Sequence, residues 1–193
     1  MIVGLTGGIG SGKTWVSSLF KDLGIAVYIS DIEAKKIMNE NILVKNAIID
    51  LFGSESYIDD KLNRSFISDK VFNDKDSLEQ LNNIVHPAVA NHFNEWYKNQ
   101  KSIFVIKESA ILFETGAQKK CDYTILVTAP VDERIKRVKA RDNATRKNIE
   151  ARINNQWLDQ KKIPLADFII NNTKKENTIK RVSGVYEIIK ALV

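Results

Sequence analysis

The sequence predicts an α/β fold in which helices cover both faces of a five-stranded, mostly parallel sheet. Short apolar runs alternate with longer stretches of helical periodicity, which is the order of β-α-β units. The runs are continuously apolar, as expected for strands that are covered on both faces. With 193 residues, 44% of them apolar and 27% charged, the chain is long enough for one domain with a substantial core.

Five apolar runs are the candidate strands of this sheet. They are Ile2–Leu5, Ile25–Ile29, Ser102–Ile106, Tyr123–Val127 and Phe168–Ile170. The first helix is expected to run from Lys13 to about Leu23, because Gly24 is typical of the position just after a helix end. The last helix is expected over about Glu176–Leu192.

The stretch from about residue 31 to residue 100 breaks the alternation and contains no convincing strand. Apolar residues at three- and four-residue spacing predict helices over Ile42–Phe52, Lys61–Phe72 and Ser77–Trp96. We therefore expect a single domain of residues 1–193, with a core of residues 1–30, 101–133 and 163–193. A helical insertion of about residues 31–100 and a lid of about residues 134–162 would complete it.

The segment GGIGSGKT, from Gly7 to Thr14, matches the P-loop pattern G-x-x-x-x-G-K-[ST] in full, between a candidate strand and a candidate helix. Glycines let the backbone curl so that its N–H groups hold phosphate oxygens, and the helix start adds its positive dipole end. Lys13 would reach the outer phosphates, and the Thr14 hydroxyl would ligate Mg²⁺. The expected ligands are thus ATP and Mg²⁺, with no tightly bound prosthetic group. The expected nucleotide-binding residues are Gly8, Ile9, Gly10, Ser11, Gly12, Lys13, Thr14 and Trp15.

Two acidic residues follow candidate strands and are expected at the same edge of the sheet as the P-loop. Asp31 follows Ile25–Ile29, and Glu108 follows Ser102–Ile106. A P-loop enzyme needs an acid that orients the metal and a group that activates the nucleophile. Each acid also has a plain structural explanation, since Asp31 could cap a helix and Glu108 could cap the turn that follows it.

An arginine-rich stretch carries the positive charge of the chain. Residues 134–152 have a net charge of +6, whereas the whole chain has +5, and five of the seven arginines lie there. Arg134, Arg137 and Arg141 are three and four residues apart, so one helix face would present all three guanidiniums. Such a basic lid could close over the transferred phosphoryl group and exclude water, although a solvated helix face has the same pattern.

The two histidines and the single cysteine are weaker candidates. His86 precedes Pro87, and we keep it as a candidate substrate contact although a histidine near a helix start is often structural. His92 is most simply a helix-surface residue. Two histidines without a neighbouring cysteine or paired acid make no metal site. Cys121 is expected to be a small buried residue.

Composition and charge exclude several classes of protein. No apolar run approaches the length of about 20 residues that a membrane span needs, and the N-terminus lacks the basic region of a signal peptide. The basic charge is confined to one stretch, which suits a compact anionic ligand better than a nucleic acid. We expect a cytoplasmic protein, a monomer or weak homo-oligomer, with no nucleic-acid or membrane partner.

The ordered set of motifs resembles the dephospho-CoA kinase family along nearly the whole chain. The residues that carry the resemblance are Gly4 to Lys13, Asp31, His86-Pro87, Leu112-Phe113-Glu114, Cys121-Asp122, Arg137 and Arg141, Arg152 and Gln156, and Ala166-Asp167 with Asn171. The resemblance implies a P-loop kinase fold with core, acceptor-binding and lid regions. Two positions depart from the family pattern: Ile29 stands where an aspartate is common, and Ala110 where a proline is common.

The same resemblance implies transfer of the ATP γ-phosphate to the ribose 3′-hydroxyl of dephospho-CoA. By similarity, Asp31 would be the general base, Lys13 the phosphate anchor and Thr14 the magnesium ligand. Arg137 or Arg141 would be the catalytic lid arginine, and the helical insertion would hold the acceptor.

Other functions are also compatible with the P-loop. Another small-molecule P-loop kinase could act on a nucleoside or nucleotide, because acceptor choice depends on pocket shape. A nucleotide-driven switch or a nucleic-acid-dependent ATPase would also need the P-loop. The guanine-reading pattern Asn-Lys-x-Asp is absent from the sequence, which argues against the switch. A scaffold protein would not need a complete P-loop.

Overall fold

The computed structural model describes residues 1–72 and 74–193. They form two compact units, which are treated separately below. The first comprises Met1–Ile29 and Gln100–Val193, and the second comprises Ser30–Asn99.

A five-stranded sheet, parallel throughout, forms the centre of the first unit. Its strands are β1 (Ile2–Thr6), β2 (Ala26–Ile29), β5 (Val105–Glu108), β6 (Tyr123–Thr128) and β7 (Phe168–Asn171), in the order β2-β5-β1-β6-β7. The predicted parallel sheet is therefore confirmed. β2 and β5 lie on one side of β1, and β6 and β7 lie on the other. The residues that follow β1 therefore lie between the loop after β5 and the loop after β6.

One predicted strand was misplaced. The run Ser102–Ile106 was expected to be a strand, but β5 begins at Val105 and continues to Glu108. The Ser102 hydroxyl explains the late start, because it accepts a bond from the Ala26 N–H (3.3 Å) and donates to the Phe104 carbonyl (2.6 Å). This local pairing replaces the sheet ladder at the first residues of the run. As a consequence, Glu108 ends the strand instead of following it.

Helices cover the sheet of the first unit and supply its core. The helical segments are α1 (Lys13–Asp22), η2 (Ala117–Lys120), α6 (Val131–Asp142), α7 (Arg146–Asn154), α8 (Asp159–Lys162), η3 (Ile163–Leu165) and α9 (Lys175–Lys190). Buried side chains of the strands pack with Val16 and Phe20 of α1 and with Val182 and Val185 of α9. The predicted end of the first helix is confirmed, since Gly24 adopts a φ of +81° just beyond it.

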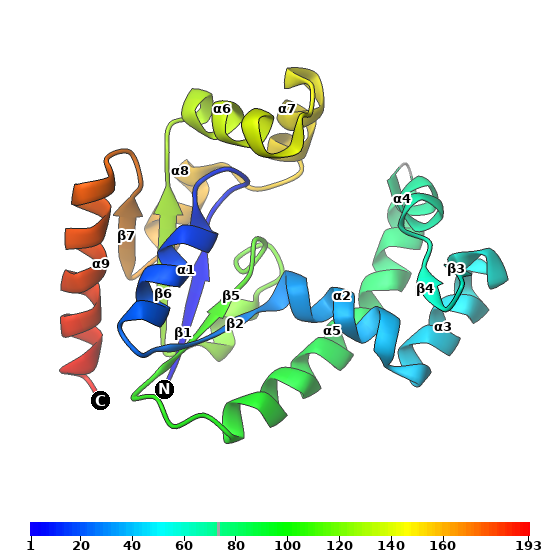
Figure 1. The fold of residues 1–193 in the computed structure, drawn as a ribbon, viewed down its shortest axis with the longest axis horizontal. Coiled ribbons are helices and arrows are strands. Elements are labelled where there is room, and N and C mark those ends of the chain that lie inside the picture. Colours follow the sequence, from blue (N-terminus) through cyan, green and yellow to red (C-terminus); the bar gives the residue numbers. More distant parts are fainter. Residues whose placement is uncertain (73) are drawn as a thin grey trace. The chain divides into compact units, whose positions relative to one another are not determined.

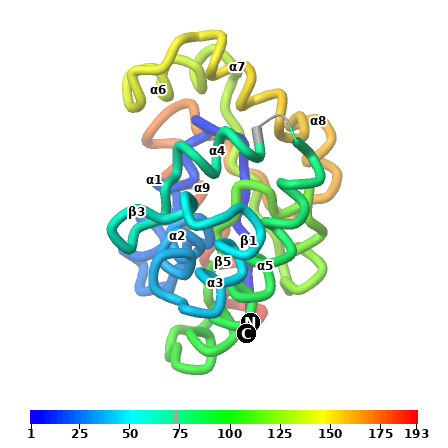
Figure 2. Tube along the Cα trace, turned by 90° about the vertical axis from the view of Figure 1, so that its right-hand side faces the viewer, coloured from blue at the N-terminus to red at the C-terminus, as the bar shows by residue number. Residues whose placement is uncertain are grey.

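In the first unit, the α6–α7 helix pair and the chain termini lie at opposite ends (Figure 1). Figure 1 shows the α6–α7 pair at one end and both termini at the other, and Figure 2 shows the same arrangement from the side. None of the helices in the described residues is both long and apolar enough to cross a membrane.

The second unit is helical with one small hairpin. Its elements are α2 (Ser30–Glu40), α3 (Ile42–Phe52), η1 (Ser54–Ser56), β3 (Tyr57–Ile58), β4 (Lys61–Leu62), α4 (Arg64–Phe72) and α5 (Lys75–Lys98). The helix expected over Ile42–Phe52 is confirmed at both ends, and the one expected over Ser77–Trp96 extends by two residues at each end.

The expectation of no strand in this stretch was wrong. Lys61 and Leu62, predicted to begin a helix, instead pair with Tyr57 and Ile58 in an antiparallel ladder. The intervening Asp59 and Asp60 have φ values of +47° and +66°, the left-handed pair that a two-residue hairpin turn requires. The helix starts only at Arg64, after this turn.

His86 and Pro87 lie in the interior of α5, not near a helix start as expected. Proline removes one helical hydrogen bond and its ring crowds the preceding turn. Figure 1 shows α5 changing direction along its length, as a proline inside a long helix would cause. Pro87 is the proline inside α5, and the neighbouring His86 is exposed.

Candidate active site

The glycine-rich loop connects β1 to α1 at the carboxyl edge of the sheet. β1 ends at Thr6, and α1 begins at Lys13. Within the loop, the Ser11 N–H donates to the Gly8 carbonyl at 3.0 Å, which closes a tight turn. The N–H groups at the start of α1 and the helix dipole therefore face the position that a phosphate group would occupy.

The loop is pressed against its neighbours so closely that side chains would not fit. A Cβ at Gly8 would collide with the guanidinium of Arg134, and a Cβ at Gly12 would collide with the Asn172 amide. Gly12 also has a φ of +94°, a conformation in which L-residues are strained. Close approach and backbone conformation thus both demand glycine at position 12.

Arg134 of α6 is built into the loop. Only 4% of its surface is exposed, its Nε donates to the Ile9 carbonyl at 2.9 Å, and Nη1 lies 3.5 Å from an Asp159 carboxylate oxygen. Burial lowers the pKa of Arg134 from its ordinary value, and the negative charge of Asp159 opposes that shift. The sequence placed this residue among solvent-facing lid arginines. The structure instead buries it as a support of the loop backbone.

Arg137 and Asn172 hold the other side of the loop. Arg137 Nη1 donates to the Ser11 carbonyl (3.3 Å) and Nη2 to the Asn172 carbonyl (2.7 Å). The Asn172 side-chain amide donates to the same Ser11 carbonyl at 2.8 Å, and its Oδ1 accepts from the Thr178 hydroxyl at 3.3 Å. Sequence reasoning missed Asn172. The only feature of the sequence that could have indicated Asn172 is that a polar residue follows the last strand, next to Asn171.

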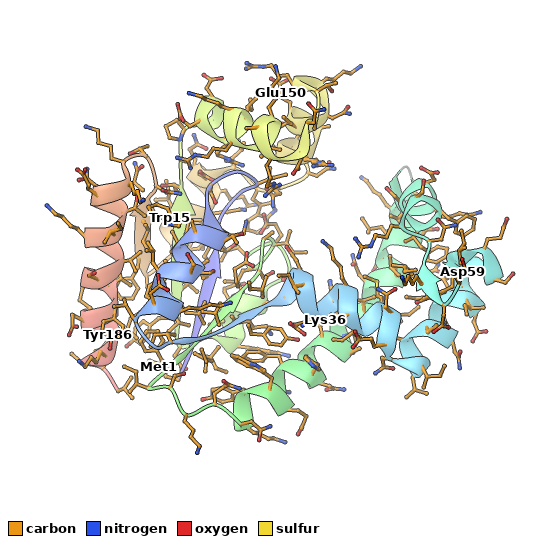
Figure 3. All side chains as sticks on the ribbon, viewed as in Figure 1. Met1, Trp15, Lys36, Asp59, Glu150 and Tyr186 are labelled. Carbon is orange, nitrogen blue, oxygen red and sulfur yellow. The ribbon has the colours of Figure 1, made fainter. Side chains whose placement is uncertain are left out.

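A cavity of about 320 Å³ opens beside this part of the loop. Its lining residues come from the start of α1, from α6 and from the turn between β7 and α9: Gly12, Trp15, Arg137, Asn172, Thr173 and Lys175. The volume is within the usual range for small-molecule sites. Trp15, labelled in Figure 3, is one of the lining residues, and Thr173 and Lys175 are two that the sequence did not suggest.

Lys13 and Glu108 meet at the phosphate end of the site. Glu108 ends β5 and pairs in the sheet with Leu5 of β1, which places its carboxylate near the loop. Lys13 Nζ lies 3.9 Å from a Glu108 oxygen and donates to the Gly7 carbonyl at 2.8 Å. Glu108 is 4% exposed, so its charge acts in a poorly solvated place. An acid and a lysine so arranged can orient phosphate oxygens and a metal ion.

Three further predicted residues, Asp31, His86 and Arg141, are described by their own surroundings. Asp31 is exposed in the first turn of α2, two residues beyond the end of β2, and belongs with His86 to the second unit. Arg141 is exposed at the far end of α6, where its guanidinium forms two bonds with Asp142 (2.7 and 3.0 Å). The three guanidiniums thus have different partners: those of Arg134 and Arg137 bond to the loop backbone, and that of Arg141 pairs with a neighbouring acid.

A metal ion would depend on the nucleotide for most of its ligands. Among the residues that the structure describes, no group of three or more His, Cys, Asp or Glu side chains could hold one. Thr14 is exposed in the first turn of α1, directly after Lys13. A hydroxyl at this position together with phosphate oxygens and water suits Mg²⁺, which retains several waters and few protein ligands.

Comparison with known proteins identifies the family. The dephospho-CoA kinase family model matches residues 1–177. A dephospho-CoA kinase from Bacteroides fragilis is 37% identical over 181 residues, which are 93% of this chain and 88% of that protein. The chain belongs to the dephospho-CoA kinase family. It is thus a phosphotransferase with a nucleotide-binding P-loop.

Solved structures share the fold. A crystal structure of a Thermus thermophilus protein matches with a TM-score of 0.89 and 30% identity, covering 100% of this chain and 98% of that one. A dephospho-CoA kinase from Campylobacter jejuni matches with a TM-score of 0.70 and 25% identity, covering 98% and 97%. Like these relatives, this dephospho-CoA kinase family member has the P-loop kinase fold.

The close packing at Gly12 predicts a selective loss of nucleotide binding. Gly12→Ala meets both a strained φ and the Asn172 amide, so it should displace the loop and abolish detectable ATP binding by calorimetry. Gly24→Ala is the matched control, because Gly24 has a φ of +81° but open space around it. It should cost only the backbone strain of about 1–2 kcal/mol in thermal unfolding and leave ATP affinity unchanged. Equal ATP affinity in both variants would contradict the steric argument.

Proposed function

We propose that this chain transfers the γ-phosphate of ATP to the ribose 3′-hydroxyl of dephospho-CoA, giving coenzyme A and ADP. The observation that carries the proposal is the complete P-loop with Lys13 beside the buried Glu108, in a chain of this family. In the reaction, a bond forms between the acceptor oxygen and the γ-phosphorus while the bond to the ADP oxygen breaks. The hydroxyl proton passes to a carboxylate of the enzyme.

The nucleotide would occupy the loop and the adjoining cavity. Backbone N–H groups of the loop between Gly8 and Thr14 would hold the phosphates, apart from those of Ile9 and Ser11, which donate to Gln156 and to the Gly8 carbonyl. Lys13 would bind the outer phosphate oxygens. The adenosine part would lie in the cavity lined by Trp15 and Arg137, where an indole and a guanidinium could stack on a base. Mg²⁺, held by Thr14 and the phosphates, would neutralise charge on the transferred group.

Asp31 is the proposed general base. Its carboxylate is exposed in the first turn of α2, and α2 directly follows β2, whose last residue Ile29 pairs with Glu108. The short connection supports a role for Asp31 near the phosphate end of the site. The family pattern commonly has two acids here, and with Ile29 at the first position Asp31 is the one of the pair that this chain retains. The helical unit of residues 30–99, with His86, would hold the acceptor.

Arg137 and Arg141 have different proposed roles. Arg137 would hold the loop and contact the nucleotide, because three backbone carbonyls already accept bonds from it. Arg141 would supply charge to the transferred phosphoryl group, since its exposed guanidinium can leave Asp142 at little cost. Residues 134–162 would then act as the lid. We also propose a cytoplasmic enzyme that is a monomer or weak homo-oligomer.

The deciding experiment is an ADP-release assay with Mg-ATP that compares dephospho-CoA with nucleosides and nucleoside monophosphates. Turnover with dephospho-CoA alone, with coenzyme A detected by mass, is expected. Turnover only with another acceptor would overturn the substrate while leaving the P-loop chemistry intact. ATP binding without turnover on any acceptor would favour a switch or a nucleic-acid-dependent ATPase, which nucleic-acid binding over a salt series would test.

Asp31→Asn should lower kcat by about 100-fold or more, because it keeps the shape and removes the proton acceptor. The free energy of unfolding should change little, since the residue is exposed. Asp22→Asn is the matched control, at the exposed end of α1, and should leave kcat unchanged. Unchanged kcat in Asp31→Asn would refute the assignment of the base.

Arg141→Ala and Arg137→Ala should differ in kind. Arg141→Ala should lower kcat by about 10³-fold with ATP affinity nearly unchanged, because its charge is needed in the transition state. Arg137→Ala should weaken ATP binding and lower the unfolding temperature, because it leaves the Ser11 and Asn172 carbonyls without this partner. Steady-state kinetics with ATP titration separates the two, and the reverse pattern would exchange their roles.

A further inference from the structure

One residue at the tip of the phosphate loop is held on three sides by the segment that follows β6. Ile9 donates its N–H to Gln156 Oε1 at 2.8 Å, and its carbonyl accepts from Arg134 Nε at 2.9 Å. Its side chain packs against a buried cluster of α6 and α7 that includes Val138 and Ile149. Arg134 precedes this cluster in the chain, and Gln156 follows it. The loop tip is therefore seated on the α6–α7 pair.

Gln156 makes a second bond with its other amide atom. Its Nε2 donates to the Ala110 carbonyl at 3.3 Å, while Oε1 accepts from Ile9. Ala110 lies two residues beyond Glu108, in the loop that leaves β5. One side-chain amide thus links the phosphate loop to the segment that carries the buried acid. Both ends of the amide are satisfied in a single orientation, so the flipped orientation is disfavoured.

A buried ion pair keeps Gln156 in place. The neighbouring Trp157 donates its N–H to Glu114 Oε1 at 3.0 Å, and the same oxygen lies 2.7 Å from Lys162 Nζ. Lys162 is fully buried. Breaking this pair would leave the Lys162 charge buried without its partner, which disfavours movement of the segment. The backbone around Gln156 is accordingly anchored to the same loop after β5 that receives its Nε2.

We propose that Gln156 is a positioning residue of the phosphate loop, which sets the Gly8–Ile9 peptide plane so that the nucleotide site is formed before ATP arrives. This inference rests on the proposed use of the loop for ATP, and it does not depend on the acceptor. Without the bridge, the loop tip would have to order on binding, and ATP affinity would fall by that cost. Two neutral hydrogen bonds of ordinary strength correspond to a loss of about tenfold in affinity.

Gln156→Met tests the bridge, because methionine retains the length and loses both bonds. A non-hydrolysable ATP analogue with Mg²⁺ should bind about tenfold more weakly by calorimetry, without any acceptor present. Exchange of the Ile9 amide hydrogen, followed by NMR, should accelerate in the free protein. In steady state, KM for ATP should rise about tenfold, while kcat and KM for dephospho-CoA change less than twofold. A merely structural role would lower the unfolding temperature without this split.

Gln160→Met is the matched control, because Gln160 is exposed on α8 four residues away. It should change neither analogue affinity nor Ile9 exchange. If Gln156→Met does not fold, Gln156→Asn serves instead, since the shorter side chain cannot span both partners, and the same shifts are expected.

Analogue affinity within twofold of the unmodified protein, unchanged Ile9 exchange, or equal losses in the control would overturn the inference. Failure of the proposed function gives a different result: no turnover of dephospho-CoA by the unmodified chain, with analogue binding still sensitive to Gln156.

Discussion

The phosphate loop between β1 and α1 depends on hydrogen bonds from other segments of the first unit to keep its backbone conformation. A glycine-rich loop has no side chains with which to stabilise its own conformation, and its free backbone is entropically costly to order. Here the loop carbonyls accept bonds from Arg134, Arg137 and Asn172. One loop N–H, that of Ile9, donates to Gln156. The two arginines come from α6, Gln156 comes from the segment after α7, and Asn172 directly follows β7. The loop is thus rigid because distant parts of the chain converge on it, and a collision follows wherever a glycine is replaced.

The order of strands explains why those parts converge. β1 has β5 on one side and β6 on the other, so the loop after β1 lies between the segments that leave both neighbours. Ligands bind at such switch points of parallel sheets because the flanking connections run in opposite directions and leave a crevice. β5 supplies Glu108 as its last residue, and the loop that follows it supplies Ala110. The segment after β6 supplies the arginines of α6. The same topology therefore brings both the chemistry and its support to one edge of the sheet.

Positive charge has two distinct uses in this protein. Arg134 is buried, and its charge is offset by Asp159 and by the loop carbonyls, so it stabilises the site in the absence of any ligand. Arg141 and Arg152 are exposed and share Asp142, a solvated arrangement of little energetic value that can exchange partners readily. A single basic stretch thus contains both permanent supports of the loop and guanidiniums that remain available to an anionic ligand. Net charge alone does not distinguish them.

The sequence by itself determined the fold class, the P-loop and the set of chemically active residue types, because these depend on local periodicity and on an unbroken motif. It placed the strand that carries Glu108 too early, since the Ser102 hydroxyl competes with the sheet for the Phe104 carbonyl. It missed the small hairpin, because two aspartates rather than glycine adopt positive φ there. Only the tertiary structure decided that Arg134 is buried, that Arg141 pairs with Asp142, and that Asn172 and Gln156 support the loop. The contacts of Arg134, Asn172 and Gln156 with the loop join residues more than 100 positions apart. The helical pattern that predicts their elements contains no information on the partner that each side chain meets.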